Sequence, residues 1–149
     1  MNKKPIIIVA IVLAAVLVIS AVGFILYQNL KPNPLGDISK AEIILQTSER
    51  HSDADIMNAV RLVKEQFRTY YGGCTLKKLY YDDEMSLSEE KLDAEILNGT
   101  DAIILGSDFH VGNISPDVSF NANEDHVGWK WIIIKDNDGN WELKDWGYG

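Results

Sequence analysis

The pattern of apolar and polar residues divides the chain into two regions of different character. From Ile6 to Tyr27 the sequence holds 22 consecutive uncharged residues, almost all of them apolar. As an α-helix this run is about 33 Å long, enough to cross a hydrocarbon core of about 30 Å. We therefore predict one N-terminal transmembrane helix, with residues 1–27 forming a short cytoplasmic stub and a membrane anchor.

The charges that flank this run predict its orientation. Lys3 and Lys4 precede it, whereas Lys31 is the only basic residue close behind it. Short flanks richer in Lys and Arg stay cytoplasmic, so we expect a single-pass protein of the cell membrane with its N-terminus inside and the domain outside. A cleaved signal peptide is the alternative, with Ala21-Val22-Gly23 as a weak cleavage site. Either alternative exports the domain.

A spacer and one domain follow the apolar run. Pro32 and Pro34 favour an extended, fairly stiff linker, which we assign to residues 28–40. Residues 41–149 then form a single extracytoplasmic domain.

The strongest helical pattern of the domain starts after Ser52. Ser52 is a good N-cap residue, and Asp53 and Asp55 suit the positive end of the helix dipole. Apolar residues recur at spacings of three and four and predict the buried face: Ile56, Val60, Val63, Phe67 and Tyr70. Gly72 and Gly73 end the helix. A shorter helix is predicted from a capping box at Ser86-Leu87-Ser88-Glu89, with Leu92 and Ile96 facing inward and Gly99 ending it.

The remaining apolar segments alternate as strands do. The predicted strands are Ala41 to Gln46, Thr75 to Tyr81, Ala102 to Val111, Val127 to Lys135 and Trp141 to Trp146. Alternation predicts two apolar faces: Ile103, Leu105, Ser107, Phe109 and Val111 in one strand, and Val127, Trp129, Trp131 and Ile133 in the next. The Asp138-Gly139 step between the last two strands favours a tight hairpin turn.

This order of elements predicts an α+β fold. With one long helix and a hairpin at the end, we expect a curved antiparallel sheet of about four to five strands packed on that helix.

Charge excludes two classes of partner. Residues 28–149 carry 12 basic and 22 acidic residues, a formal charge of 12 − 22 = −10. An acidic domain repels the phosphates of nucleic acid and does not lie on anionic lipid. We therefore expect no nucleic acid partner, and contact with the membrane only through residues 6–27.

Several polar residues are candidates for metal binding or catalysis, and each of them also has a simpler structural interpretation. The connection from Gly112 to His126 is long enough to suggest a function, and its Asp, Asn, Glu and His side chains offer metal ligands. Without a metal-binding spacing, a solvated loop is the simpler interpretation. Asp108 and His110 are alternative general bases, but no nucleophile motif or phosphate loop accompanies them. We expect no cofactor, no bound metal and no catalytic residue, and we interpret the single Cys74 as a small buried hydrophobe.

The aromatic residues of the domain suggest a ligand site. Tyr80, Trp129 and Trp131 lie on predicted strands, where they can line a concave pocket or simply form the core. With Asp108 and His110, they are our candidate ligand-binding residues.

Several segments together carry a resemblance to a known group of proteins. They are the helix Asp53 to Tyr71, the strand Gly73-Cys74-Thr75-Leu76-Lys77-Lys78-Leu79-Tyr80-Tyr81-Asp82, the strand Ile104 to Phe109, Trp129-Lys130-Trp131-Ile132-Ile133, and Trp141 to Tyr148. This set resembles small membrane-anchored extracytoplasmic proteins of Gram-positive bacteria, which are uncharacterised. The resemblance implies a cystatin-like fold in the broad nuclear-transport-factor-like group, which includes both binding modules and isomerases that use a pocket Asp.

Pattern and resemblance together predict a membrane-anchored binding or interaction module. Its ligand would be a protein, a peptide or a small apolar molecule, held by the concave face of the sheet and the loop from Gly112 to His126. The alternative is a small pocket enzyme, an isomerase or hydrolase of the cone-shaped fold, with Asp108 or His110 as its base.

Overall fold

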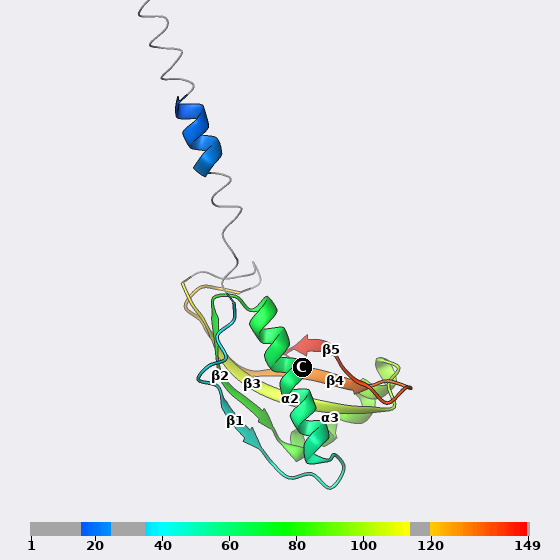
Figure 1. The fold of residues 1–149 in the computed structure, drawn as a ribbon. Coiled ribbons are helices and arrows are strands. Elements are labelled where there is room, and N and C mark those ends of the chain that lie inside the picture. Colours follow the sequence, from blue (N-terminus) through cyan, green and yellow to red (C-terminus); the bar gives the residue numbers. More distant parts are fainter. Residues whose placement is uncertain (1–15, 25–34, 114–119, 149) are drawn as a thin grey trace, which may run out of the picture. The chain divides into compact units, whose positions relative to one another are not determined.

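The structure is a computed structural model that describes residues 16–24, 35–113 and 120–148 (Figure 1). The chain divides into two units, Met1–Asn33 and Pro34–Gly149. In the first unit, residues 16–24 are helical, and the rest of the predicted membrane segment lies outside the described residues. No helix within the described part of the chain combines the length and the apolar character needed to cross a membrane.

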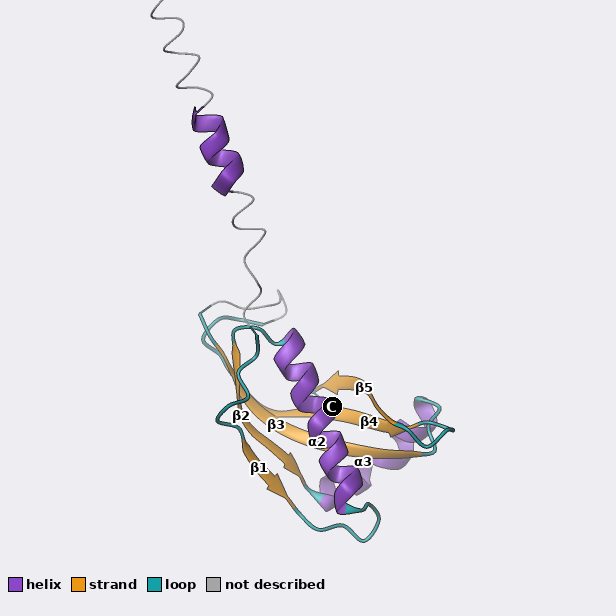
Figure 2. Cartoon of the chain, in the orientation of Figure 1, coloured by secondary structure: helices purple, strands orange, loops and turns teal. Residues whose placement is uncertain are grey.

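The second unit has an α+β fold with a five-stranded mixed sheet. In chain order its elements are β1 (Glu42–Leu45), α2 (Asp53–Tyr70), β2 (Cys74–Tyr81), α3 (Asp83–Ile96), β3 (Asp101–Val111), β4 (Asp125–Lys135) and β5 (Trp141–Gly147). The strands lie in sequence order across the sheet, from β1 at one edge to β5 at the other. Figure 2 shows α2 on one face of the sheet and α3 on the other.

The prediction of a wholly antiparallel sheet is wrong at β1. This strand pairs parallel to β2, with Glu42 opposite Lys78 and Leu45 opposite Tyr81. Two adjacent parallel strands need a crossover connection, and the long helix α2 provides it between β1 and β2. The other three strand pairs are antiparallel, as predicted.

Helix α2 packs its apolar stripe on the sheet. The expected N-cap is confirmed, because the Ser52 side chain accepts a hydrogen bond from the backbone N–H of Asp55. The buried residues of the helix are Ile56, Ala59, Val60, Val63 and Phe67. Tyr70 was predicted to face inward but is 67% exposed, whereas Tyr71 is buried. The reason is that the helix ends at Tyr70, and the non-helical backbone of Tyr71 turns its side chain toward the core.

Helix α3 begins earlier than the predicted capping box. Asp82 caps it, since its carboxylate accepts hydrogen bonds from the backbone N–H groups of Glu84 and Met85 at 3.0 and 2.9 Å. Ser86 lies inside the helix, where its hydroxyl accepts a hydrogen bond from the backbone N–H of Ile104 at 3.2 Å. Ile96, which was predicted to face inward, is 63% exposed. The helix covers part of the face of β3 and β4 opposite α2, where Ile104 and Ile134 are buried.

The predicted faces of β3 and β4 hold except at one position. All five predicted inward residues of β3 are fully buried, but Val127 of β4 is 67% exposed. The pairing of β3 with β4 is irregular here, and Gly128 adopts a positive φ of 74°. A bulge therefore breaks the simple alternation that placed Val127 with Trp129. The hairpin between β4 and β5 turns at Gly139, as predicted, with a φ of 85°.

Cys74 has the buried position that was predicted for it. Its side chain is 1% exposed, and burial raises the pKa of the thiol to about 11. The neutral thiol is thus the dominant form at neutral pH, and Cys74 packs as a small apolar residue.

Candidate functional site

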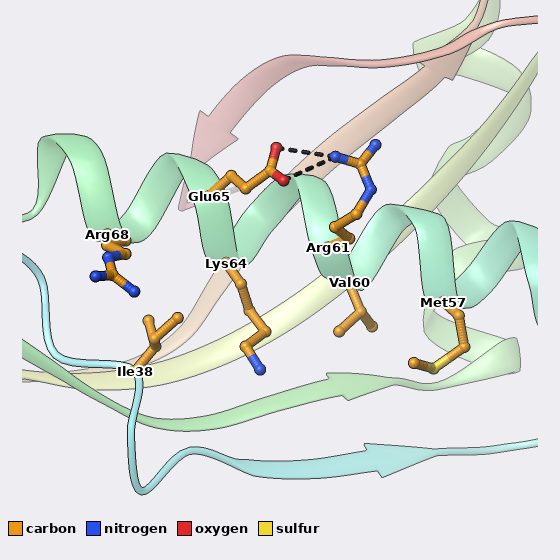
Figure 3. A pocket seen from close by; sticks show the side chains of 7 residues that line it. All are labelled: Ile38, Met57, Val60, Arg61, Lys64, Glu65 and Arg68. Atoms are coloured by element: carbon orange, nitrogen blue, oxygen red, sulfur yellow. Dashed lines mark hydrogen bonds and ion pairs between the residues drawn. The ribbon is translucent and has the colours of Figure 1, made fainter.

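The described surface is hollowed along one side of α2, between the helix and strand β1 (Figure 3). One hollow, of about 290 Å³, is lined by Ile38, Met57, Val60, Arg61, Lys64, Glu65 and Arg68. A second, of about 350 Å³, is lined by Leu45, Gln46, Thr47, Asp53, Ile56 and Met57. The two hollows share Met57 and so lie next to each other along the helix, and together we call them the α2–β1 groove.

The groove exists because α2 does not cover the whole sheet. The helix contacts β5, β3 and β2, and its long axis passes over them. Strand β1 therefore lies beyond the cover of the helix, and its side chains are exposed on both faces. Ile43 and Leu45, which point to the same face as α2, are 37% and 38% exposed.

The helix presents a second stripe of residues to this groove, beside its buried stripe. Met57, Arg61, Lys64 and Arg68 follow one another at spacings of four, three and four, so they share one side of the helix. Met57 is 52% exposed, while the neighbouring Val60 is 4% exposed and forms part of the floor. The groove thus combines an apolar floor with a cationic rim.

Two of these cations have no partner in the described part of the protein. Arg61 is satisfied, because its guanidinium donates two hydrogen bonds to Glu65 at 2.8 and 2.9 Å and one to Asn58 at 2.8 Å. The side chains of Lys64 and Arg68 make no hydrogen bond or ion pair with any described residue. In Figure 3 the Arg61–Glu65 pair points away from β1, whereas Lys64 and Arg68 extend toward Ile38 and the β1 side.

The lining of the first hollow is therefore positive on a domain that is strongly acidic. It holds Arg61, Lys64 and Arg68 against Glu65, a formal charge of 3 − 1 = +2. The whole chain carries −8. An anionic group is attracted to this end of the groove, and cations are attracted to most of the remaining surface.

The outer edge of β1 adds backbone hydrogen-bonding groups to the site. The backbone N–H of Gln46 donates to the carbonyl oxygen of Tyr81 at 3.2 Å, so Gln46 points toward β2. In a parallel pair, alternate residues direct both N–H and C=O to the same neighbour. The peptide groups of Ile43 and Leu45 consequently point away from β2, toward the open edge.

The sequence-predicted site residues lie elsewhere, and the sheet divides them between its two faces. Trp129 and Trp131 lie on the α2 face. Trp131 is fully buried and donates its indole N–H to Ser107 at 2.8 Å. Trp129 is partly buried against Phe109, Phe120 and Tyr148. Neither tryptophan lines the α2–β1 groove.

The other three predicted residues lie on the opposite face. The ring of Tyr80 lies over Gly106, and burial raises the pKa of Tyr80, with further contributions from the negative charges of Asp108 and Asp82. Asp108 accepts a hydrogen bond from the backbone N–H of Gly128 at 3.0 Å, and His110 pairs with Asp125 at 2.8 Å. Neither described hollow includes Asp108 or His110. The role of all five residues in ligand binding stays a prediction.

The loop from Gly112 to His126 is described only in part, because residues 114–119 lie outside the described residues. His126 bonds to the hydroxyl of Tyr148 through Nδ1 at 2.8 Å, while its buried Nε2 and the Nε1 of Trp129 have no hydrogen-bond partner among the residues that the structure describes. Across residues 16–24, 35–113 and 120–148, no group of three or more His, Cys, Asp or Glu side chains is arranged to hold a metal ion.

The sequence analysis missed the groove residues Met57, Lys64 and Arg68. Their signal is present in the sequence, as a stripe one position away from the buried stripe of α2. This stripe indicates a binding site only when the position of β1 is known, because β1 lies beside the stripe and the helix does not cover it.

Comparison with other proteins adds nothing to this geometry, because no known protein family, curated protein or solved structure matches the chain significantly.

Proposed function

We propose that this protein is a membrane-anchored binding module that holds a segment of another protein in its α2–β1 groove. The observation that carries the proposal is the groove itself: an apolar floor at Val60 and Met57, beside the cations Lys64 and Arg68, which have no partner among the described residues. Apolar surface left exposed beside a few convergent polar groups is typical of binding sites.

The dimensions of the groove favour a peptide over a small molecule. Each hollow, at about 290 and 350 Å³, is at the lower limit for a site that encloses a whole drug-sized ligand, about 300 Å³. Two shallow hollows in line instead suit successive side chains of a chain that lies along the helix. Peptides that bind beside an exposed strand are recognised in this way.

The location and the fold class that we propose come from the sequence. We propose that residues 6–27 anchor the protein in the cell membrane, with the N-terminus inside and the domain outside. The long helix α2 packed on one face of the sheet supports a cystatin-like fold. A C-terminal reporter fusion that is active only outside the cytoplasm should be active, and activity of a cytoplasmic reporter instead would contradict the orientation.

The alternative of a pocket enzyme needs Asp108 or His110 at the bottom of a pocket. Asp108 accepts from a backbone N–H, and His110 is paired with Asp125 on the face opposite α2. Because neither of them lines a described hollow, no specific observation favours this alternative.

The binding proposal can be tested with the full chain in detergent on an array of random synthetic peptides of about ten residues. We expect a subset of peptides to bind. Met57→Glu should weaken these by about tenfold or more, because it puts a charge on the apolar floor. The matched control is Val127→Glu, which changes an exposed apolar residue of β4 outside the groove, at 67% exposed against 52% for Met57. Absence of binding, or equal binding by both variants, would contradict the proposal.

A further inference from the structure

We infer that the ligand of the α2–β1 groove binds as an additional strand on β1, and that it is an extended acidic segment of another protein. Its backbone would pair with Ile43 and Leu45, and its carboxylates would meet Lys64 and Arg68. This inference rests on the proposed function, which requires only that some peptide occupies the groove.

The open edge of β1 provides the backbone half of this recognition. The peptide groups of Ile43 and Leu45 point outward, as the bond from Gln46 to Tyr81 requires. Sheet edges in soluble proteins are usually protected by charges, proline or a covering element. Here the edge carries Ile43, Ile44 and Leu45 in succession, each at least 37% exposed. The strand is short, at four residues, but no described segment covers it, and an open apolar edge of this kind is suited to strand addition.

The position of α2 allows the side chains of an added strand to be recognised as well as its backbone. Because the side chains of Ile43 and Leu45 point to the α2 face, an added strand would direct every second side chain to that same face. These side chains would stand beside Ile43 and Leu45 on the outer side of β1, and long ones would lean over the edge toward the second hollow, which Leu45 and Met57 line. One ligand can therefore pair with the edge and reach the groove with its long side chains.

Charge complementarity selects the ligand chemistry. Lys64 and Arg68 extend toward the end of the groove near Ile38, which precedes β1 (Figure 3). At the other end, the second hollow includes Asp53 and no cation. A ligand with carboxylates at one end matches this polarity, whereas a basic ligand would meet Lys64 and Arg68 with like charge. A second copy of the chain is a less suitable occupant, because the two domains each carry a large negative charge.

The test uses fluorescein-labelled probes of about eight residues, the length of a strand, that alternate valine and threonine. One probe carries two glutamates at its C-terminal end and another carries them at its N-terminal end, so that the tighter one reports the direction of the added strand. A matched probe carries lysines in place of the glutamates. Binding to the full chain in detergent is measured by fluorescence anisotropy.

We expect one acidic probe to bind about tenfold more tightly than the lysine probe, the effect of two partly exposed ion pairs. The double variant Lys64→Glu with Arg68→Glu should reverse this preference. The matched control, Lys144→Glu on β5, should leave it unchanged. N-methylation of alternate residues in the probe tests the backbone: methyl groups on one set should abolish binding, while those on the other set should have little effect. On binding, amide hydrogen exchange should slow at Ile43 and Leu45 but not at Ile44.

Three results would overturn the inference, and they can be told apart. If both methylated probes bind like the parent, the peptide occupies the groove without strand addition, and the proposed function stands alone. If acidic and basic probes bind equally, the charge assignment is wrong. If sedimentation without any probe shows a dimer that Ile43→Lys dissociates, the occupant of the edge is a second copy of the chain. Failure of every peptide, including those of the random array, would remove the proposed function as well.

Discussion

The centre of the sheet and its β1 edge are stabilised in different ways. At the centre, β3 and β4 lie between two helices, and Trp131, Phe109 and Leu105 are fully buried. At the edge, Ile43, Ile44 and Leu45 are equally apolar but remain 37% to 43% exposed. Apolar side chains therefore stabilise the fold at the centre of the sheet, whereas at the β1 edge they stay exposed and available to contact a ligand.

Polar interactions hold the edge region instead. Gln46 donates to Asp82 at 3.1 Å, and Arg50 pairs with Asp83 at 3.0 Å. The hydroxyl of Tyr81 donates to Asp83 at 2.7 Å. These bonds fix the segment after β1 to the start of α3 without covering β1. Strand β1 can keep its apolar surface open because these polar contacts and its pairing with β2, and not burial of that surface, hold it in place.

The largest effect is expected at the centre, from Trp131→Ala. Removing this fully buried indole should lower the free energy of unfolding by about 3 to 5 kcal/mol. Urea unfolding followed by circular dichroism measures it. Trp146→Ala removes a 42% exposed tryptophan from the neighbouring strand β5 and should lower the free energy of unfolding much less than Trp131→Ala. Equal losses for the two variants would mean that the centre is not the main source of stability.

Two adjacent residues of α2 separate stability from binding. Ile56→Ala removes a buried side chain and should lower the free energy of unfolding by about 2 to 5 kcal/mol. Met57→Ala removes a 52% exposed side chain and should change it by only about 0.5 kcal/mol, while weakening peptide binding. Unfolding and anisotropy titrations on the same preparations check both. A large stability loss from Met57→Ala would place the groove in the structural core and remove the distinction between the two regions.

The smallest effect is expected from Asp83, at the polar edge. Hydrogen bonds from Ser48 and Tyr81, with the guanidinium of Arg50, lower the pKa of Asp83 from 3.8 to about 2. A carboxyl group whose pKa is lower in the folded state adds stability above its unfolded pKa. That stability is lost as the pH falls from about 4 toward about 2. Asp83→Asn should therefore reduce the melting temperature at neutral pH and make its decline in acid shallower.

Thermal unfolding monitored at pH values from about 7 down to about 2 tests this dependence. The control is Asp138→Asn in the β4–β5 turn, whose carboxylate makes no hydrogen bond or ion pair with described residues. It should leave the slope in acid unchanged. If the Asp83 variant follows the same acid profile as the unmodified protein, the network around Tyr81 does not stabilise the edge.

Much of the fold could be predicted from local pattern. The spacing of Ile56, Val60, Val63 and Phe67 predicted the buried stripe of α2, and alternation predicted the inward residues of β3. Predictions were wrong where an element ends or bends: Tyr70 at the last turn of α2, Ile96 at the end of α3, and Val127 at a bulge. A regular period identifies a face only while the backbone stays regular, and caps and bulges depend on contacts from distant segments.

The candidate site was much less predictable than the fold. Aromatic residues drew attention to Tyr80, Trp129 and Trp131, yet an aromatic side chain on a strand is suited both to a core and to a pocket. Met57, Lys64 and Arg68 look like an ordinary exposed side of a helix in the sequence. They form a groove only because β1 pairs with β2 and lies beyond the helix. This arrangement brings together residues that are distant in the sequence, so a local pattern cannot predict it.

From the sequence alone we could predict the order of helices and strands, the hairpin at Gly139, the burial of Cys74 and the acidic character of the domain. These properties follow from composition and from periodicities that act over a few residues. Three further properties became visible only in the folded chain: β1 is parallel to β2, the predicted ligand residues fall on two opposite faces, and Lys64 and Arg68 have no partner among the described residues near the β1 edge. Each of these properties depends on how distant segments pack. Which strand pairs with which, and which part of a sheet a helix covers, depend on the packing of the whole core and not on any local stretch of sequence.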